Sequence, residues 1–307
     1  MSVTGGILAR IEYIFATIDK MPVIVFALIS YLGWGTGDIF GTIATRKIGS
    51  YSTTFWYLIF QIFLFSFLAL FFLADLQNLT LPVLVLNLAL GIIGTLGLIA
   101  FYEGLRIANA SLVGTIAASF AALTVVLSII FLGETITWPQ AVSIIAIFAG
   151  VIISSLQFKE LRNRNLLTNR GVLLAITTMI MWGIYWAFIK VPVRETGWFW
   201  PGFISLSSFP IILIFLKLRN LKLSMPSTKG VFLPLLANAV LLGVGSFSFN
   251  FALGKGLTAI VAPIAGSYPT LFVVLAFLVF RDSITRQQIF GIVITLIGIV
   301  LLSIFSI

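Results

Sequence analysis

Long apolar runs follow one another along almost the whole chain, and only short polar segments separate them. Each run holds about twenty mostly apolar residues, the length that a helix needs to cross the hydrocarbon core of a bilayer. The runs cover residues 22–44, 52–73, 82–106, 111–132, 138–156, 171–190, 199–216, 231–253, 258–280 and 286–307. The pattern therefore predicts an all-α integral membrane protein with ten transmembrane helices.

The pattern also repeats once at a constant offset. Trp34 recurs as Trp182 and Gly150 as Gly298, and both differences (182 − 34 and 298 − 150) are 148 residues. The same offset relates Phe55 to Phe203, Phe101 to Phe249, Ser119 to Ser267 and Gln140 to Gln288. Five runs per copy is an odd number, so the second copy must enter the membrane upside down. Many secondary transporters build a substrate site near the bilayer midplane from such inverted repeats.

This duplication divides the chain into four parts. Residues 22–156 and 171–307 are the two predicted five-helix repeats around a central cavity, and residues 157–170 are the loop that links them. Residues 1–21 precede the first repeat and place Ile7, Ile11, Ile14 and Ile18 on one helical face. This spacing favours a short amphipathic helix in the membrane interface. A frayed terminus is the alternative.

Both repeats begin their fifth helix with the same polar pattern. Thr137 and Gln140 in the first copy correspond to Thr285 and Gln288 in the second. A threonine followed three residues later by a glutamine fits a capping box, in which both side chains bond the first free backbone amides. We assign this pattern to stability and not to transport.

Composition supports a membrane protein and excludes several kinds of site. Hydrophobic residues make up 60% of the chain and charged residues only 9%, whereas soluble domains carry about 25% charged residues. The chain has no cysteine and no histidine, which excludes disulfides, thiol nucleophiles, Cys/His zinc sites and catalytic histidines. We predict no metal, no cofactor and no enzymatic activity.

The net charge of +9 lies in short loops, where basic residues set topology and meet anionic lipid headgroups. Nucleic acid is therefore not an expected partner. Of the lysines and arginines, five lie on the side of the termini and thirteen on the opposite side. The positive-inside rule thus predicts that both termini lie outside the cytoplasm. We expect the membrane to be a prokaryotic cell membrane.

Several motifs together resemble one family. They are Trp34-Gly-x-Gly-Asp38-Ile-Phe40, Arg46-Lys47-x-Gly49, Ala100-Phe-Tyr-Glu-Gly-Leu105, Ala110-Ser-Leu-Val113, Leu132-Gly-Glu134, Val261-Ala-Pro-Ile264, Tyr268-Pro269 and Arg281-Asp282. In this order and spacing they are similar to EamA-type members of the drug/metabolite transporter superfamily. The resemblance covers nearly everything from the first helix onward.

The resemblance implies a basket of helices one to four and six to nine around the cavity, with helices five and ten outside it. It also implies alternating access by rocking of the two halves. Members move amino acids, sugars, nucleotide-linked compounds, purines or lipophilic drugs, so the family leaves the substrate open. The chain departs from the pattern at Ala121, which stands where the second copy has Pro269. We therefore expect only the ninth helix to be bent by proline there. The charge count also puts the termini opposite to where many relatives have them.

Charged side chains within the spans are candidate functional residues, because a charge inside the membrane is costly. Asp38 and Glu103 lie in the last third of helices that leave on the same side, so they could approach each other and share a proton. The alternatives are that Glu103 pairs with Arg106 and that Asp38 reaches headgroup water. We expect Lys190 and Lys255 to extend to the interface; the alternative is a gate or a contact to a substrate carboxylate.

Aromatic and uncharged polar residues mark the expected binding layer. The candidates are Trp34, Tyr102, Ser119, Trp182, Tyr185, Trp186, Asn250, Ser267 and Tyr268. The tryptophans and tyrosines could instead be interfacial anchors, the serines could bond their own helix, and Asn250 could join two helices. Glycines in helices one and three favour close helix packing. Pro263 and Pro269 free backbone groups in helix nine, where we expect a hinge.

These features favour a secondary-active transporter that works by alternating access, coupled to protons if the two carboxylates share one. We expect it to export a small polar or amphipathic metabolite such as an amino acid. Alternatives with the same fold are a sugar or nucleoside uptake carrier and a drug exporter, and alternatives from other classes are a lipid flippase and a membrane-embedded enzyme. The expected partners are a small-molecule substrate and the lipid bilayer, and the expected state is a monomer or weak homodimer.

Overall fold

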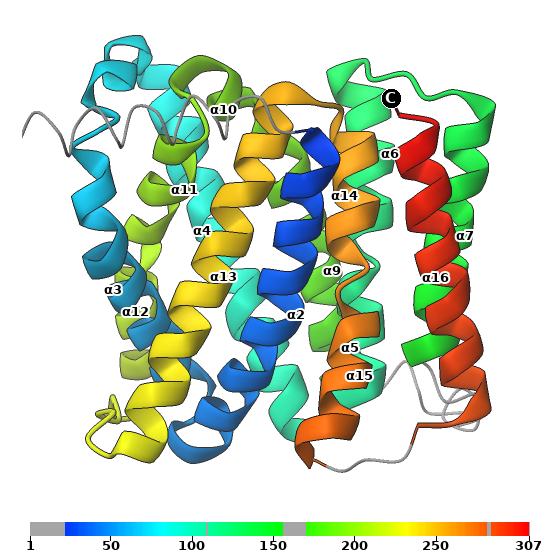
Figure 1. Ribbon diagram of the computed structural model, residues 1–307. Coiled ribbons are helices and arrows are strands. Elements are labelled where there is room, and N and C mark those ends of the chain that lie inside the picture. The colour runs from blue at the N-terminus through cyan, green and yellow to red at the C-terminus, as the bar shows by residue number, and fades with distance from the viewer. Residues whose placement is uncertain (1–21, 109, 156–169, 281–283, 307) are drawn as a thin grey trace, which may run out of the picture.

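The computed structural model describes residues 22–108, 110–155, 170–280 and 284–306. The amphipathic helix predicted for residues 1–21 and nearly all of the predicted linker lie outside the described residues. Within them the chain is helical (Figure 1). Among the described residues, ten helical segments are long and apolar enough to cross a membrane, as the hydrophobic runs predict, so the chain is a multi-pass membrane protein.

The first repeat comprises α2 (Val23–Ile48), α3 (Ser50–Ala69), the short η1 (Leu73–Asn78), α4 (Leu81–Ile107), α5 (Ala110–Ala118), α6 (Phe120–Leu132) and α7 (Trp138–Ser155). The second comprises α9 (Arg170–Phe188), α10 (Lys190–Thr196), α11 (Phe199–Ser205), η3 (Leu206–Ser208), α12 (Pro210–Leu218), α13 (Lys229–Lys255), α14 (Thr258–Gly266), α15 (Pro269–Phe280) and α16 (Arg286–Ile304). Several spans therefore consist of two helical segments.

Helices pack across the two repeats in symmetric pairs. Helix α2 packs along α13, and the repeat-related α9 packs along α4. Small residues bring these helices close: a Cβ added at Gly33 would lie 2.6 Å from the carbonyl oxygen of Leu241 and 2.9 Å from the Cα of Gly245. The glycine faces therefore serve helix packing, as the sequence indicated.

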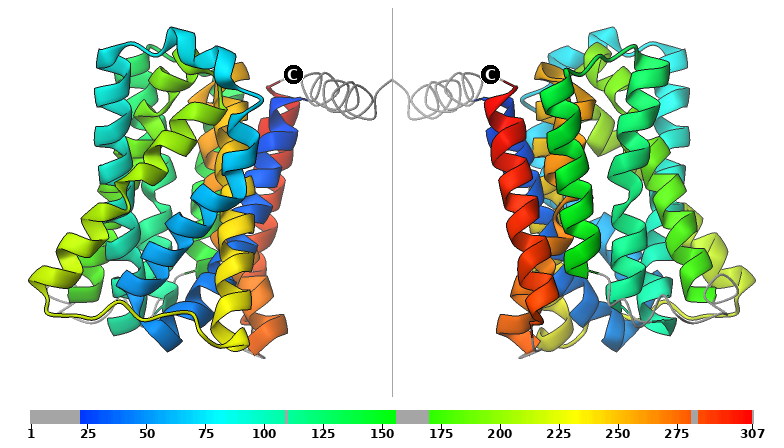
Figure 2. Two further views of the ribbon diagram at one scale, coloured as in Figure 1. Left: turned by 90° about the vertical axis from the view of Figure 1, so that its left-hand side faces the viewer. Right: turned by 90° about the vertical axis from the view of Figure 1, so that its right-hand side faces the viewer.

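Helices α7 and α16 lie side by side at one edge of the bundle (Figures 1 and 2). A Cβ at Gly291 would overlap the backbone of Ser154, so these two helices touch almost backbone to backbone. This arrangement leaves the other spans to surround the centre, as the resemblance implied.

Helix breaks occur at the same depth in both repeats. The first separates α5 from α6 at Ser119, and the second separates α14 from α15 at Ser267 and Tyr268. Only the ninth helix has a proline at its break, as Ala121 and Pro269 predict, but the fourth helix is also broken, which the sequence pattern did not indicate. A Cβ at Gly266 would overlap the Ala121 side chain, so the two broken spans cross in direct contact. Ser119 Oγ donates to the Thr115 carbonyl oxygen at 3.1 Å, a bond typical of bent helices.

The capping box forms fully at the last helix. Thr285 Oγ1 accepts from the Gln288 backbone amide, and Gln288 Oε1 accepts from the Thr285 amide at 2.9 Å. In the first copy, Gln140 Oε1 accepts from the Thr137 amide at 2.8 Å, while its Nε2 donates to the Phe305 carbonyl oxygen at 3.0 Å. Gln140 therefore joins α7 to the end of α16.

Candidate functional site

A cavity of about 120 Å³ lies between the two repeats. Six helices contribute to its wall, namely α2, α3, α4, α9, α11 and α13, together with residues at the two helix breaks. The lining includes Trp34, Asp38, Tyr57, Gln61, Thr95, Phe120, Trp182, Tyr185, Trp186, Ser205, Ser246, Phe247 and Tyr268. Six of the predicted site residues are therefore at the cavity: Trp34, Asp38, Trp182, Tyr185, Trp186 and Tyr268.

Aromatic rings form much of the wall. The ring centroid of Trp34 lies 4.8 Å from that of Trp186 and 6.0 Å from that of Tyr268. On the other side, Trp182 lies 5.7 Å from Phe120 in an edge-to-face arrangement. These distances are typical of favourable aromatic contacts, so the rings hold one another in place around the cavity.

The two mid-span tryptophans occupy equivalent positions in the inverted repeats. The Trp34 ring lies on Gly245 of α13, and the Trp182 ring lies on Gly97 of α4. The two glycines are also 148 residues apart (245 − 97). Each indole is further fixed by a hydrogen bond at 3.3 Å, from Trp34 Nε1 to Ser246 Oγ and from Trp182 Nε1 to the Gly94 carbonyl oxygen. Each ring therefore packs on a helix of the other repeat.

Asp38 is the charged residue of the cavity wall. Its side chain is buried at 5% exposure, and the Tyr268 hydroxyl lies within hydrogen-bonding reach of its carboxylate. The hydroxyls of Tyr57 and Tyr102 are near enough to interact with this charge. Among the described residues no lysine or arginine forms an ion pair with Asp38. The carboxylate thus faces the cavity among phenol groups.

Glu103 lies elsewhere. Arg106 Nη2 approaches its Oε1 to 2.6 Å, and Ser50 Oγ donates to its Oε2 at 2.8 Å. The carboxylate is not among the groups that line the cavity. The structure therefore agrees with the alternative in which Glu103 pairs with Arg106. The two side chains are three residues apart and share one face of the helix.

The remaining polar candidates lie behind the wall. Tyr102 is fully buried, and its hydroxyl accepts from Asn238 Nδ2 at 3.4 Å. Ser267 Oγ donates to the Ile264 carbonyl oxygen at 2.6 Å, and Ser119 bonds its own helix as described above. Asn250 is fully buried and packs against Gly202, without a hydrogen-bond partner among the described residues.

The two prolines of the ninth span have different positions. Pro263 lies inside α14, and Pro269 begins α15 directly after the break. Pro269 lacks the amide that would continue the helix across the break. Their function as a hinge stays a prediction.

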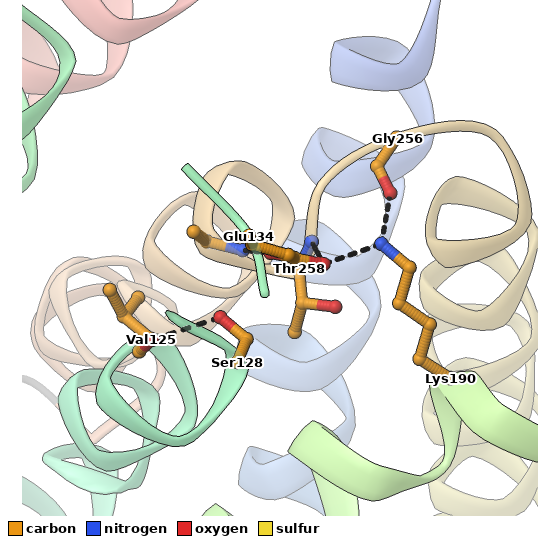
Figure 3. Close-up of polar contacts among 7 residues, drawn as sticks. Val125, Ser128, Glu134, Lys190, Gly256 and Thr258 are labelled. Carbon is orange, nitrogen blue, oxygen red and sulfur yellow. Dashed lines mark hydrogen bonds and ion pairs between the residues drawn. The ribbon is translucent and has the colours of Figure 1, made fainter. Parts of the chain in front are cut away.

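A buried ion pair lies outside the cavity, and the sequence pattern did not indicate it. Lys190 Nζ lies 2.5 Å from Glu134 Oε1 and donates to the Gly256 carbonyl oxygen at 2.7 Å (Figure 3). Glu134 also accepts from the backbone amides of Thr258 at 2.9 Å and Ala259 at 2.8 Å. The expectation that Lys190 extends to the interface was wrong, because α10 continues beyond it and its ammonium group is buried against Glu134 and the Gly256 carbonyl oxygen.

Glu134 lies between two spans, in the turn after α6. Burial raises the pKa of its carboxyl, but the hydrogen bonds from Lys190 and from the amides of Ala259 and Thr258 outweigh this effect. The pKa of Glu134 therefore lies below its usual range, and the side chain is a carboxylate at neutral pH. The Leu132-Gly-Glu134 motif was the signal that could have pointed to it.

Lys255 agrees better with the expectation that it extends to the membrane interface. Its Nζ lies 4.8 Å from the ring centroid of Phe251, a cation–π contact at an exposed helix end. Lys190 and Lys255 therefore differ, although both lie near the ends of predicted spans.

Comparisons with known proteins agree with this architecture. The model of the EamA-like transporter family matches residues 21–156 and 169–304. An uncharacterized protein of Methanocaldococcus jannaschii is 29% identical over 134 residues, which cover 44% of this chain and 96% of that protein. That relative therefore has the length of one repeat.

A solved crystal structure also has this fold. It superposes with a TM-score of 0.75 over 92% of this chain and 98% of the other, at 15% sequence identity. At this identity the similarity concerns the fold alone.

Proposed function

Because the chain belongs to the EamA-like transporter family, we propose that it carries a small amphipathic metabolite with a positively charged amino group, such as an amino acid, across the membrane by alternating access. The observation that carries this proposal is Asp38, a buried carboxylate in a cavity whose wall is otherwise aromatic and neutral.

An ammonium group suits this wall in two ways. The carboxylate of Asp38 would accept its hydrogen bonds, and charge-assisted bonds of this kind are among the stronger ones. The rings of Trp34, Trp186 and Tyr268 would add cation–π attraction, worth about 0.5–2 kcal/mol for each well-placed ring. A neutral sugar or nucleoside would leave the carboxylate without a cation, which is costly in a nonpolar cavity.

The same carboxylate supports proton coupling. An unpaired charge in a low-dielectric site is unfavourable, so Asp38 holds either a proton or a cation. A proton and a substrate ammonium group would therefore compete for one position, and one would leave as the other binds. This competition supports exchange of substrate for protons, in which only Asp38 of the two predicted acids takes part.

The proposed direction of transport is stated relative to an orientation in the membrane. Lysines and arginines in the described residues lie mainly at the ends of α2, α4, α12 and α13 away from the C-terminus, which supports an orientation with that face in the cytoplasm. Export of the substrate from that face is our proposal, in line with the resemblance.

Binding of matched ligands tests the substrate class. Tryptophan fluorescence of the purified protein would be titrated with amino acids, the corresponding N-acetyl amino acids, sugars and nucleosides. We expect binding of a ligand with a free amino group and a loss of about tenfold or more on acetylation, since removal of a buried charge pair costs at least 1.4 kcal/mol. Equal binding of the acetylated ligand, or preference for a sugar, would reject an amine substrate.

Variants then test the carboxylate. Asp38→Asn should abolish ligand binding and its pH dependence. Glu103→Gln changes an acid outside the cavity wall, so it should leave ligand binding and its pH dependence unchanged. In proteoliposomes, a pH gradient should drive uptake of the ligand by the unaltered protein and not by Asp38→Asn. If Asp38→Asn retains the pH profile, Asp38 is not the proton site.

A further inference from the structure

We propose that the Glu134–Lys190 ion pair is the gate that closes the cavity on the face of the membrane where the described chain ends at α16. The proposal rests on transport by alternating access. It assigns the closure of one face to a pair of residues outside the binding cavity.

The pair joins the two repeats to each other. Glu134 belongs to the first repeat, in the turn between α6 and α7. Its partners all belong to the second repeat: the Lys190 ammonium group at the start of α10, and the amides of Thr258 and Ala259 at the start of α14. Rocking of the halves against each other at this face must separate these groups.

The pair lies between the cavity and one membrane face. Lys190 follows Trp186 of the cavity wall by four residues, which is about one helical turn. Glu134 follows the end of α6, whose first residue, Phe120, also lines the cavity. Figure 1 shows α10 and the beginning of α14 at the end of the bundle where the C-terminus lies. The pair therefore lies on the side of the cavity that faces the C-terminal end of the bundle.

Burial makes the contact a discrete switch. The side chains of Lys190 and Glu134 are 3% and 2% exposed, so neither charge has access to bulk water while the pair is intact. Separating them inside the protein would leave two buried charges without an opposite charge beside them, which is strongly unfavourable. The pair can therefore come apart only when water enters from this face, so its breakage and the opening of the face are one event.

The opposite face is held differently. Across the repeats, Lys47 Nζ donates to the Gly230 carbonyl oxygen at 2.9 Å and Trp56 Nε1 to the Ser224 carbonyl oxygen at 2.9 Å, both in exposed positions. The position that repeats Lys190 is Thr42 (190 − 148), whose hydroxyl bonds the Asp38 carbonyl oxygen in its own helix. The ion pair thus favours the state closed on the C-terminal face.

Accessibility of an introduced thiol tests the gate. The chain has no cysteine, so Val193→Cys, at a buried position of α10 one turn beyond Lys190, provides a single reporter. Its labelling by a membrane-impermeant maleimide would be measured in proteoliposomes without ligand. We expect Glu134→Gln or Lys190→Met to raise the labelling rate by about tenfold or more, since coupling of this size is typical of conformational switches.

Two controls separate a gate from a merely structural contact. Met225→Cys in the exposed α12–α13 connection should label equally in all backgrounds. The double variant Glu134→Gln with Lys190→Met removes both charges, so no single buried charge remains without its partner. It should therefore fold even if one of the single variants does not. The proposal would be overturned if the double variant unfolds at a lower temperature but its Val193→Cys labelling rate is unchanged. Because no ligand is present, failure of amine binding would leave this result standing.

Discussion

The packing of each mid-span tryptophan on a glycine of the other repeat can be tested without touching either ring. Gly97→Ala places a methyl group 2.6 Å from Cδ1 and 2.7 Å from Nε1 of Trp182, and Gly245→Ala places one 2.7 Å from Cδ1 of Trp34. Ordinary contact begins at 3.4 Å, so each indole must move by about 0.7–0.8 Å. We expect both variants to weaken ligand binding.

The size of the effect follows from what holds each ring. Movement of Trp182 stretches its 3.3 Å bond to the Gly94 carbonyl oxygen, worth about 0.5–1.5 kcal/mol. Movement of Trp34 after Gly245→Ala shifts a ring that is placed for cation–π attraction to the ligand, which forfeits part of a contact of about 0.5–2 kcal/mol. A total of about 1–2 kcal/mol corresponds to a 5- to 30-fold rise in Kd. The two variants should behave alike, because the repeats relate them.

Ligand affinity and thermal unfolding would be measured side by side. Gly114→Ala in α5 is the matched control, since an added Cβ there meets no heavy atom within 4 Å. It should leave affinity unchanged and raise stability slightly, by up to about 1 kcal/mol from helix propensity. If Gly97→Ala and Gly245→Ala bind ligand as well as Gly114→Ala does, the tryptophans are packing residues and not part of the binding site.

Two further predictions concern stability. Gly291→Ala should lower the unfolding temperature, because overpacking costs about 1–3 kcal/mol. It should leave ligand affinity unchanged, since α16 does not reach the cavity wall. Weakened binding would show that the contact between α7 and α16 also affects the binding site. The lowered pKa of Glu134 implies stability that is complete above the usual carboxyl pKa and is lost as pH falls through the lowered value. Glu134→Gln should therefore flatten the acidic part of a plot of Tm against pH, and an unchanged slope would show that another group titrates there.

The spans and the duplication could be predicted from the sequence because both depend on patterns that local packing hardly alters. About twenty apolar residues must be helical in lipid, where no water can satisfy the backbone, and the structure places a helix in every predicted run. The mid-span position of Trp34 and Trp182 likewise follows from run length and offset. Their inclusion in the cavity wall follows from the inverted geometry.

The helix breaks were harder to predict because tertiary contacts decide them. Pro269 marks one break, but Ala121 in the other copy gives no comparable local signal. The contact of Gly266 with Ala121 involves two residues far apart in the chain. A rule that assigns bends to proline alone therefore finds one of two related breaks.

The contacts of the charged residues were the hardest feature of the structure to predict, because their partners can lie far away in the sequence. Residues 190–196 include a proline and three charged side chains, so the apolar run ended at Lys190 and suggested a free helix end. The structure continues as α10, which buries the lysine against Glu134, 56 residues earlier. Glu103 was predictable only in its alternative role, since Arg106 is a neighbour on the same helix.

The placement of charge also breaks the symmetry that the duplication creates. Asp38 corresponds to Trp186 by the repeat offset (186 − 38 = 148), and both line the same cavity. An ammonium group between them would therefore have a carboxylate on one side and an indole face on the other. Lys190 corresponds to the neutral Thr42, so the buried ion pair acts on one face only. Two halves with identical side chains would make the two open states equal in energy. Asp38 and Lys190 lack a charged counterpart in the other repeat. If Glu134 and Lys190 form the proposed gate, the state that they close is favoured at rest, and ligand binding at Asp38 is expected to supply the free energy that separates the pair.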